Sequence, residues 1–213
     1  MPTTDHDLPA FYPRTTAMRK LLLLCVTGIV IAASAVSLAA TRVPSSTALW
    51  QKIQALQKAN TLMLESKAYQ PGSRSVDAYT IDLANQAGNA AIRKTGSIEK
   101  VRRYPNGALV VKENFSEQRK LTGVTAMLKL FGYDRADRDW VMAAYSPAGK
   151  VVAYGRVPSC IACHAMVARQ DFVFAPPPEQ LLSISIWKAF FRNQHISPAY
   201  VRLLRSHPQA VVK

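Results

Sequence analysis

The sequence predicts an α+β protein that consists mainly of an antiparallel β-sheet with a few flanking helices. Short segments rich in valine, threonine, tyrosine and other strand-forming residues recur between residues 76 and 155. Tight turns separate several of them, at Pro105-Asn106-Gly107 and at Pro147-Ala148-Gly149. Helical patterns of apolar residues lie on either side of this region. Short strands joined in this way are typical of an antiparallel sheet.

The first elements combine a long helix, a strand and a short helix. Residues 47–67 form the long helix, with Ser45 or Ser46 as its cap. Its apolar residues recur at helical spacing at Leu49, Ile53, Leu56 and Met63. Residues 76–82 alternate weakly and predict a strand, and residues 83–94 predict a helix that Gly96 ends.

The strands that follow are expected to form the body of the sheet. A polar loop with five charged residues interrupts them at residues 134–139. The predicted strands are residues 101–104, 108–115, 121–131, 140–145 and 150–155.

The first forty residues are similar to an export sequence. After a polar extension at residues 1–17, Arg19 and Lys20 precede an apolar stretch at residues 21–40 that ends in small residues. This order is typical of a secretory signal peptide. The apolar stretch is also long enough to cross a bilayer once, so an uncleaved anchor is the alternative. In both cases we expect the rest of the chain to lie in the periplasm.

Composition limits the classes of partner. The 213 residues contain 27 Lys and Arg against 13 Asp and Glu, a net charge of +14, and 49% are hydrophobic, enough to form a core. Three cysteines exclude a scaffold held by many disulfides. A basic charge suits nucleic acid, but an exported protein meets no genome. We therefore expect no nucleic acid, and instead an acidic soluble redox partner or a membrane surface.

Cys160-Ile161-Ala162-Cys163-His164 is the most informative motif. Two thiols at this spacing can each add to a haem vinyl group, while the histidine places its imidazole on the iron. The alternatives are a redox dithiol, which would follow a βαβ unit that the sequence lacks, and half of a zinc site completed by His195 or His207. A single motif predicts one covalently attached haem c.

The position of the motif bears on the sixth iron ligand. Met166 follows His164 too closely to reach the opposite face of the same haem, and no methionine comes later. The sixth position is therefore either open or filled from upstream. The upstream candidates are Met63, Met127 and Met142, which also fit the core. An open site indicates binding of, or catalysis on, a small molecule.

Several stretches in order resemble the cytochrome P-460 family, which includes the beta-type cytochromes c-prime. They are residues 104–113, 139–152, the Cys160–His164 motif and Asp171-Phe-Val-Phe174, and the resemblance covers about residues 76–176. It implies a mainly antiparallel β fold, a homodimer, and a five-coordinate haem with His164 as its axial ligand. P-460 members oxidise hydroxylamine, whereas the beta-type cytochromes c-prime have an apolar pocket and bind nitric oxide or carbon monoxide.

The resemblance gives Lys112 a special role. In P-460 members a lysine at the matching position bonds to a haem meso carbon, a bond that the c-prime members lack. From the residues alone, Lys112 shares a strand face with Val110 and Asn114, where burial would favour its neutral amine. A solvated strand lysine is the alternative.

The distal acid or base has no clear match, and Arg74 and Arg156 are the weak candidates.

The C-terminal segment extends beyond the resemblance. Residues 181–191 form an expected apolar helix that covers the haem edge or a dimer interface. The alternative is a basic contact with a membrane or partner, through Lys188, Arg192, Arg202 and Arg205. We divide the chain into a signal peptide or anchor at residues 1–40, a haem-binding domain at 41–176 and a C-terminal helical extension at 177–213.

The favoured function is a periplasmic haem oxidoreductase that acts on hydroxylamine or nitric oxide at an open iron. One alternative is a beta-type cytochrome c-prime-like protein that binds nitric oxide without turnover. Another is a simple electron carrier, against which the absence of a late methionine ligand argues.

Overall fold

The computed structural model describes residues 42–73 and 77–212. These residues belong to one compact unit. The predicted signal peptide or anchor and its extension lie outside the described residues, as does Arg74. Within the described ranges, no helix has both the length and the apolar character needed to cross a bilayer.

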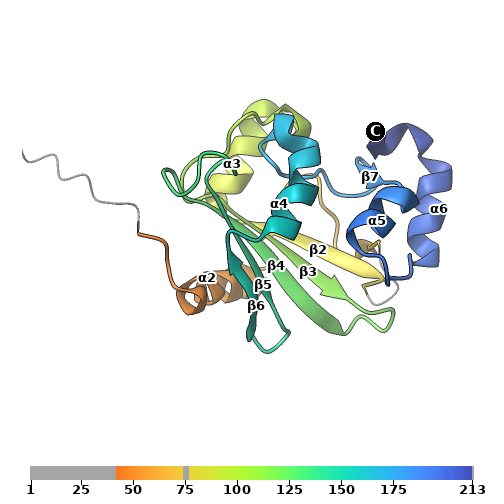
Figure 1. Ribbon diagram of the computed structural model, residues 1–213, viewed down its shortest axis with the longest axis horizontal. Coiled ribbons are helices and arrows are strands. Elements are labelled where there is room, and N and C mark those ends of the chain that lie inside the picture. The colour runs from red at the N-terminus through yellow and green to blue at the C-terminus, as the bar shows by residue number, and fades with distance from the viewer. Residues whose placement is uncertain (1–41, 74–76, 213) are drawn as a thin grey trace, which may run out of the picture. The chain divides into compact units, whose positions relative to one another are not determined.

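A six-stranded antiparallel sheet forms the centre of the fold, and its strands are adjacent in the order in which they occur along the chain. Figure 1 shows this sheet with helices on both sides. The structure therefore confirms the predicted fold class. The strands are β1 (Gln70–Pro71), β2 (Tyr79–Ala84), β3 (Leu109–Phe115), β4 (Leu121–Lys129), β5 (Trp140–Tyr145) and β6 (Val151–Gly155).

The two faces of the sheet pack against different helices, because alternate side chains of a strand point to opposite faces. On one face, Val111 and Ala126 belong to a buried cluster with Leu49 and Ile53 of helix α2 (Ser46–Ala59). The other face supports a second cluster.

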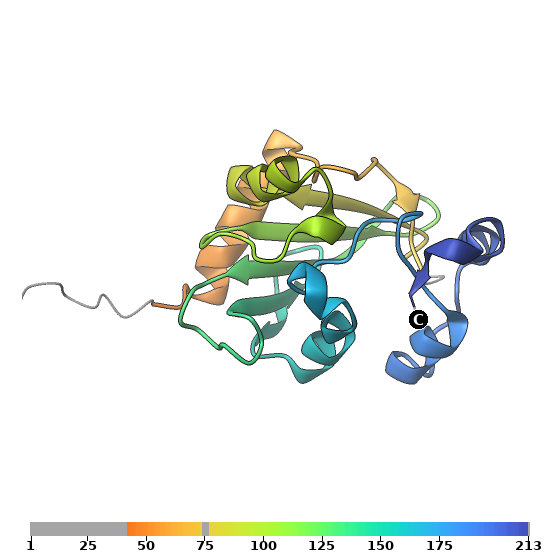
Figure 2. The same ribbon diagram turned by 90° about the horizontal axis from the view of Figure 1, so that it is seen from above.

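This second cluster includes Val110, Met127 and Met142, which are neighbours across β3, β4 and β5. Figures 1 and 2 show helices on this side of the sheet. They are α3 (Gln86–Thr95), η1 (Ile98–Lys100), α4 (Pro158–His164) and η2 (Ala165–Gln170).

The first helix is shorter than predicted. Ser45 caps it as expected, with its hydroxyl accepting a hydrogen bond from the Ala48 backbone N–H. The helix ends at Ala59 because Asn60 adopts a left-handed conformation, which turns the chain away. The helix predicted at 83–94 begins three residues later, at Gln86, because the preceding residues continue β2. Gly96 ends it as predicted.

The predicted strand at residues 101–104 is wrong. This segment has no strand partner, and the Tyr104 backbone N–H donates instead to the Asp171 carboxylate. The Pro105-Asn106-Gly107 turn leads into β3, which pairs with β2 and β4. Strand β5 has the predicted bounds, and β3, β4 and β6 differ from theirs by one or two residues.

The C-terminal segment is more elaborate than the single helix predicted at 181–191. Leu181 and Leu182 form β7, which pairs in parallel with β8 (Val211–Val212). Between them lie α5 (Ile184–Phe190), α6 (Pro198–Ser206) and η3 (Pro208–Ala210). Figures 1 and 2 show this segment beside α4, at one end of the sheet.

Candidate haem site

Helix α4 brings the three residues of the haem motif together. Pro158 occupies its first turn, where its missing N–H has no cost. Cys160, Cys163 and His164 all line one cavity of about 340 Å³, a size within the range of about 300–1,000 Å³ typical of ligand sites. Both thiols are free, and burial raises the pKa of each.

The alternatives to haem attachment gain no support. Across residues 42–73 and 77–212, no three or more His, Cys, Asp and Glu side chains gather in a way that would hold a metal ion. The zinc alternative therefore lacks a ligand set. Haem c requires two reduced thiols and a neighbouring imidazole. Cys160, Cys163 and His164 supply these groups and face one cavity. The residues present fit this cofactor.

A backbone carbonyl fixes the orientation of His164. Its Nδ1 donates to the Phe172 carbonyl oxygen at 2.6 Å, so Nε2 is the nitrogen left for a metal. The Phe174 ring lies edge-on to the imidazole, with 5.4 Å between the centroids. Burial lowers the pKa of His164, which favours the neutral form that ligates iron.

A buried network holds the loop that carries this carbonyl. The Asp171 carboxylate accepts hydrogen bonds from Lys129 Nζ at 2.7 Å and from the Tyr104 N–H at 2.6 Å. The Asp171 carbonyl accepts one from Trp140 Nε1 at 2.8 Å. Asp171 and Phe172 both have positive φ, so the chain turns sharply where it meets His164. Sequence reasoning missed the role of Lys129, because its partner lies 42 residues later.

Strands β2, β3 and β4 form the floor of the cavity, and Lys112 lies on it. Its half-buried side chain lines the cavity with Val110 and Asn114, the two residues predicted to share its face. Its positive charge lowers the pKa of both Cys163 and His164, although burial has the larger effect on each. The structure therefore brings Lys112 to the haem motif.

Asp82 is a site residue that sequence reasoning did not identify. It lies directly opposite Lys112 in the β2–β3 register and lines the same cavity. Gln70 Nε2 donates to its Oδ2 at 2.7 Å, whereas the buried Oδ1 has no hydrogen-bond partner among the described residues. Burial raises the pKa of Asp82, and the charge of Lys112 opposes this. An aspartate flanked by Ile81 and Leu83 in a strand was the available signal.

The structure does not bring Arg156 to the cavity. Its exposed guanidinium pairs with Asp137 at 2.7 Å and with Asp134 at 3.2 Å, in the charged loop. Arg74, the other weak candidate, falls within the three residues that the structure does not describe. The acidic and basic side chains that line the cavity, among the described residues, are instead Asp82 and Lys112, beside the imidazole of His164.

The three candidate methionines line the cavity from its floor. Met63, Met127 and Met142 are also buried in the core cluster around α3 and α4. Met166 does not line the cavity. Each of the three sulfur atoms thus belongs to a packed side chain next to the sheet.

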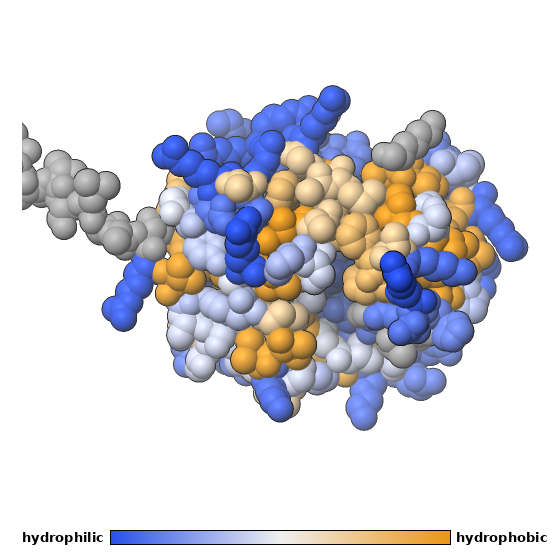
Figure 3. All heavy atoms as spheres, in the orientation of Figure 1, coloured by the Kyte–Doolittle hydropathy of each residue, from blue (hydrophilic) through white to orange (hydrophobic). Residues whose placement is uncertain are grey.

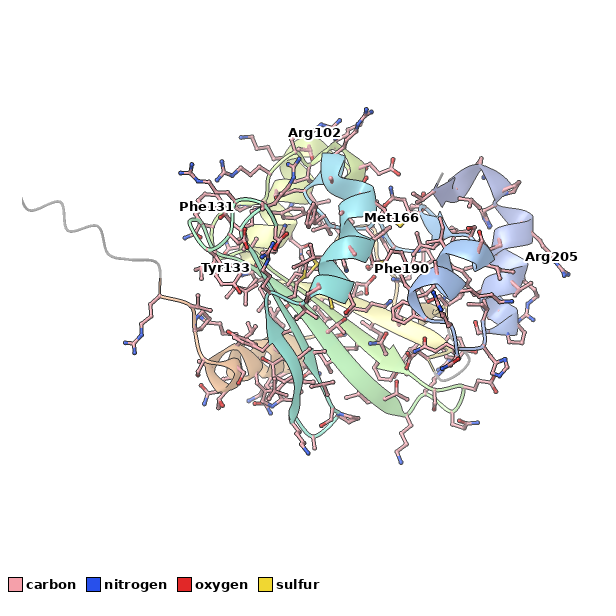
Figure 4. The ribbon with its side chains drawn as sticks, viewed as in Figure 1. Arg102, Phe131, Tyr133, Met166, Phe190 and Arg205 are labelled. Carbon is pink, nitrogen blue, oxygen red and sulfur yellow. The ribbon has the colours of Figure 1, made fainter. Side chains whose placement is uncertain are left out.

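Aromatic residues of the C-terminal segment form another wall. Trp187, Phe190 and Phe191 line the cavity together with Tyr200 of α6. Figure 4 draws Phe190 in the region between α5 and α4, the helix that carries the haem motif. Burial raises the pKa of the Tyr200 hydroxyl.

Comparison with known proteins identifies the family. A sequence model described as Cytochrome P460 matches residues 50–175, more than half of the chain. No curated protein matches the sequence. The match spans the sheet, the Cys160–His164 helix and the Asp171 loop that orients the histidine. The chain is therefore a haem cytochrome and belongs to the cytochrome P460 family.

Proposed function

We propose that the chain is an exported mono-haem c-type cytochrome whose iron is open to small nitrogen compounds, hydroxylamine and nitric oxide. Cys160 and Cys163 would hold the haem through thioether bonds, and His164 would supply the axial nitrogen. When bound, the haem supplies an iron that binds a small ligand and exchanges electrons with it. We further propose a soluble redox partner and a homodimer.

The proposal of an open iron rests on which residues form the wall that faces α4. Trp187, Phe190 and Phe191 have no side-chain group that commonly ligates haem iron. The fourth ring of the wall, Tyr200, has its hydroxyl engaged by the Leu182 N–H and carbonyl. The methionines that line the cavity, Met63, Met127 and Met142, are packed in the core cluster. An iron bound by His164 would therefore face an apolar wall on its other side. This arrangement favours a vacant coordination position over electron transfer with two axial ligands.

Lys112 supports the P-460-like version of this function. The sheet delivers its side chain into the cavity of the haem motif, and Asp82 lies opposite it. One carboxylate oxygen of Asp82 has no donor within residues 42–73 and 77–212. The pair supplies a positive and a negative group next to the reaction space. We propose that Lys112 bonds covalently to the haem, as the family resemblance implies. The new bond from Nζ to a meso carbon would replace one N–H and the meso C–H, a two-electron oxidation that requires an external oxidant such as a peroxide.

Mass spectrometry and the optical spectrum of the purified holoprotein test this proposal. We expect one haem on the peptide that contains Cys160 and Cys163, cross-linked to the peptide that contains Lys112. The Lys112→Met variant should keep the haem and lose the cross-link, whereas Lys120→Met, at an exposed lysine beyond β3, should keep both. A spectrum of ordinary c-type haem without a Lys112 peptide would remove the P-460-like assignment.

Anaerobic mixing with hydroxylamine and an electron acceptor tests turnover. Haem reduction followed by consumption of the acceptor would support an oxidoreductase. If neither occurs and the ferrous protein still binds nitric oxide, the second candidate stands, a nitric-oxide-binding cytochrome. The rings of Phe190 and Phe191 favour that candidate, because they offer no acid or base for proton transfer.

A further inference from the structure

We propose that residues 176–212 form a wall that selects the ligands of the haem site by size. This segment follows the family-matched residues. Its aromatic side chains would admit small linear molecules and hinder the binding of branched ones. The inference rests on the proposed open iron, and it assigns to this segment a specificity role that the haem motif does not explain.

The wall consists of large rings that support one another. Trp187 and Phe191 have centroids 5.1 Å apart, and Trp187 meets Tyr200 edge-on at 6.4 Å. Rings in such clusters have few rotamers available, because each fills the space next to the other. Movement of one ring therefore requires movement of its neighbours, which makes the cluster a firm boundary for a ligand.

Hydrogen bonds connect separate parts of the C-terminal segment to one another. The Tyr200 hydroxyl accepts from the Leu182 N–H at 2.7 Å and donates to the Leu182 carbonyl at 3.2 Å. The parallel pairing of β7 with β8 brings Leu181 opposite Val211, at the end of the chain. Helices α5 and α6 are thus held between two paired strands, and the aromatic cluster keeps its shape.

Two further anchors fix this segment to the rest of the site. On one side, Gln180 Oε1 accepts from the Ala175 N–H at 2.7 Å, and Gln180 Nε2 donates to Gln170 Oε1 at 3.1 Å. On the other side, Ser197 Oγ donates to the Gly72 carbonyl at 2.8 Å. The segment is therefore attached next to the haem-motif loop and next to β1, with the aromatic wall between these points.

The same observations argue against a membrane contact by the apolar face of α5. Trp187, Phe190 and Phe191 are half-buried and line the cavity, so their rings face the site and not a membrane surface. Ile184 is the one large apolar residue of α5 that is exposed. In Figure 3 hydrophilic residues project around much of the rim of this face, and Figure 4 draws Arg205 pointing outward from α6. The basic residues do not form part of the wall, because the cavity lining does not include Lys188, Arg192, Arg202 or Arg205.

Ligand binding to the ferrous holoprotein tests the size selection. Carbon monoxide serves as the small probe and tert-butyl isocyanide as the branched one, with rates and affinities measured by stopped-flow mixing and flash photolysis. Trp187→Ala and Phe190→Ala should raise the affinity for the isocyanide by about tenfold or more, since deleting a pocket side chain changes discrimination by this order. The affinity for carbon monoxide should change by much less.

Ile184→Ala is the matched control, because it truncates an exposed apolar residue of the same helix. It should leave both affinities unchanged. Trp187→Phe provides a milder variant that keeps a ring and should give an intermediate gain, which covers the case in which Trp187→Ala fails to fold.

The outcomes distinguish the selective wall from the open iron on which it depends. If carbon monoxide binds the parent protein and none of the wall variants alters the isocyanide affinity, the selective wall is wrong and the open iron stands. If the parent protein binds neither ligand, the iron is not open, and both proposals fall. A gain for the isocyanide alone, in the wall variants but not in Ile184→Ala, supports the wall.

Discussion

Lys129 and Asp171 form an ion pair in the interior, with Nζ 2.7 Å from Oδ2 and each side chain only 1% exposed. The pair connects strand β4 to the loop after the haem motif. Asp171 immediately precedes Phe172, whose carbonyl holds His164 Nδ1. A charge pair that does not itself line the cavity thereby helps to fix where the axial imidazole points.

Lys129→Met is expected to destabilise the protein strongly. The variant leaves the buried Asp171 carboxylate without its cation, which typically costs about 3–5 kcal/mol. Urea denaturation of the holoprotein, followed by circular dichroism, measures the free energy of unfolding. The double variant Lys129→Met/Asp171→Asn should recover part of this loss, because it buries no uncompensated charge and keeps an acceptor for the Tyr104 N–H. No recovery would mean that the pair contributes mainly through packing.

Asp82→Asn should change how stability depends on pH. Burial raises the pKa of Asp82 above its ordinary value of 3.8, so the folded protein holds this proton at a pH where the unfolded chain has lost it. The free energy of unfolding of the parent protein therefore falls as pH rises through this interval. An asparagine does not titrate, so it causes no such fall in the free energy of unfolding. The stability of Asp82→Asn relative to the parent should grow from acid to neutral pH.

Denaturant titrations at several pH values measure this difference. Glu117→Gln, which removes one negative charge at an exposed position, is the control. A difference between Asp82→Asn and the parent that stays constant with pH would contradict the raised pKa.

Gly149→Ala should be more harmful than Gly107→Ala. Both glycines have φ near +80°, so alanine at either position carries a cost of about 1–2 kcal/mol for the left-handed conformation. At Gly149 the added methyl group would also run into the Trp50 indole, whereas at Gly107 it meets no atom within 4 Å. Forcing the indole aside adds about 1–3 kcal/mol. Thermal unfolding compares the two variants, and equal melting temperatures would show that Trp50 yields without cost.

Ser197→Ala should loosen the C-terminal segment. The Ser197 hydroxyl accepts from the Tyr200 N–H at the start of α6 and donates to the Gly72 carbonyl, so its loss removes both a helix cap and an anchor. Capping alone contributes about 0.5–2 kcal/mol. Ser183→Ala removes the cap of α5 without breaking an anchor to β1. Limited proteolysis should therefore cut Ser197→Ala faster within residues 176–212, and equal rates for the two variants would argue against the anchor.

The parts of the fold that sequence reasoning located correctly are those specified by nearby residues. Strand β5 was predicted with its observed bounds because the charged loop and the Pro147-Ala148-Gly149 turn flank it closely. Cys160, Cys163 and His164 share one helical turn, so their approach to one cavity required no knowledge of distant contacts.

The errors and omissions arose where distant residues decide the structure. Residues 101–104 have strand-forming side chains, yet Asp171 captures the Tyr104 N–H from 67 positions away. The role of Asp82 depends on a strand register that places it against Lys112. Helix α6 did leave a local signal, Ser197 followed by Pro198, which is a typical helix start.

The position of the aromatic wall at the end of the chain bears on the order of assembly. The sheet and α4 are complete by residue 175, and the strands pair with their neighbours in sequence, which favours early formation. During synthesis the residues of α4 emerge before those of α5. We therefore expect the two thiols to be accessible at first from the side that α5 later covers. Folding of residues 176–212 then restricts access to the cavity.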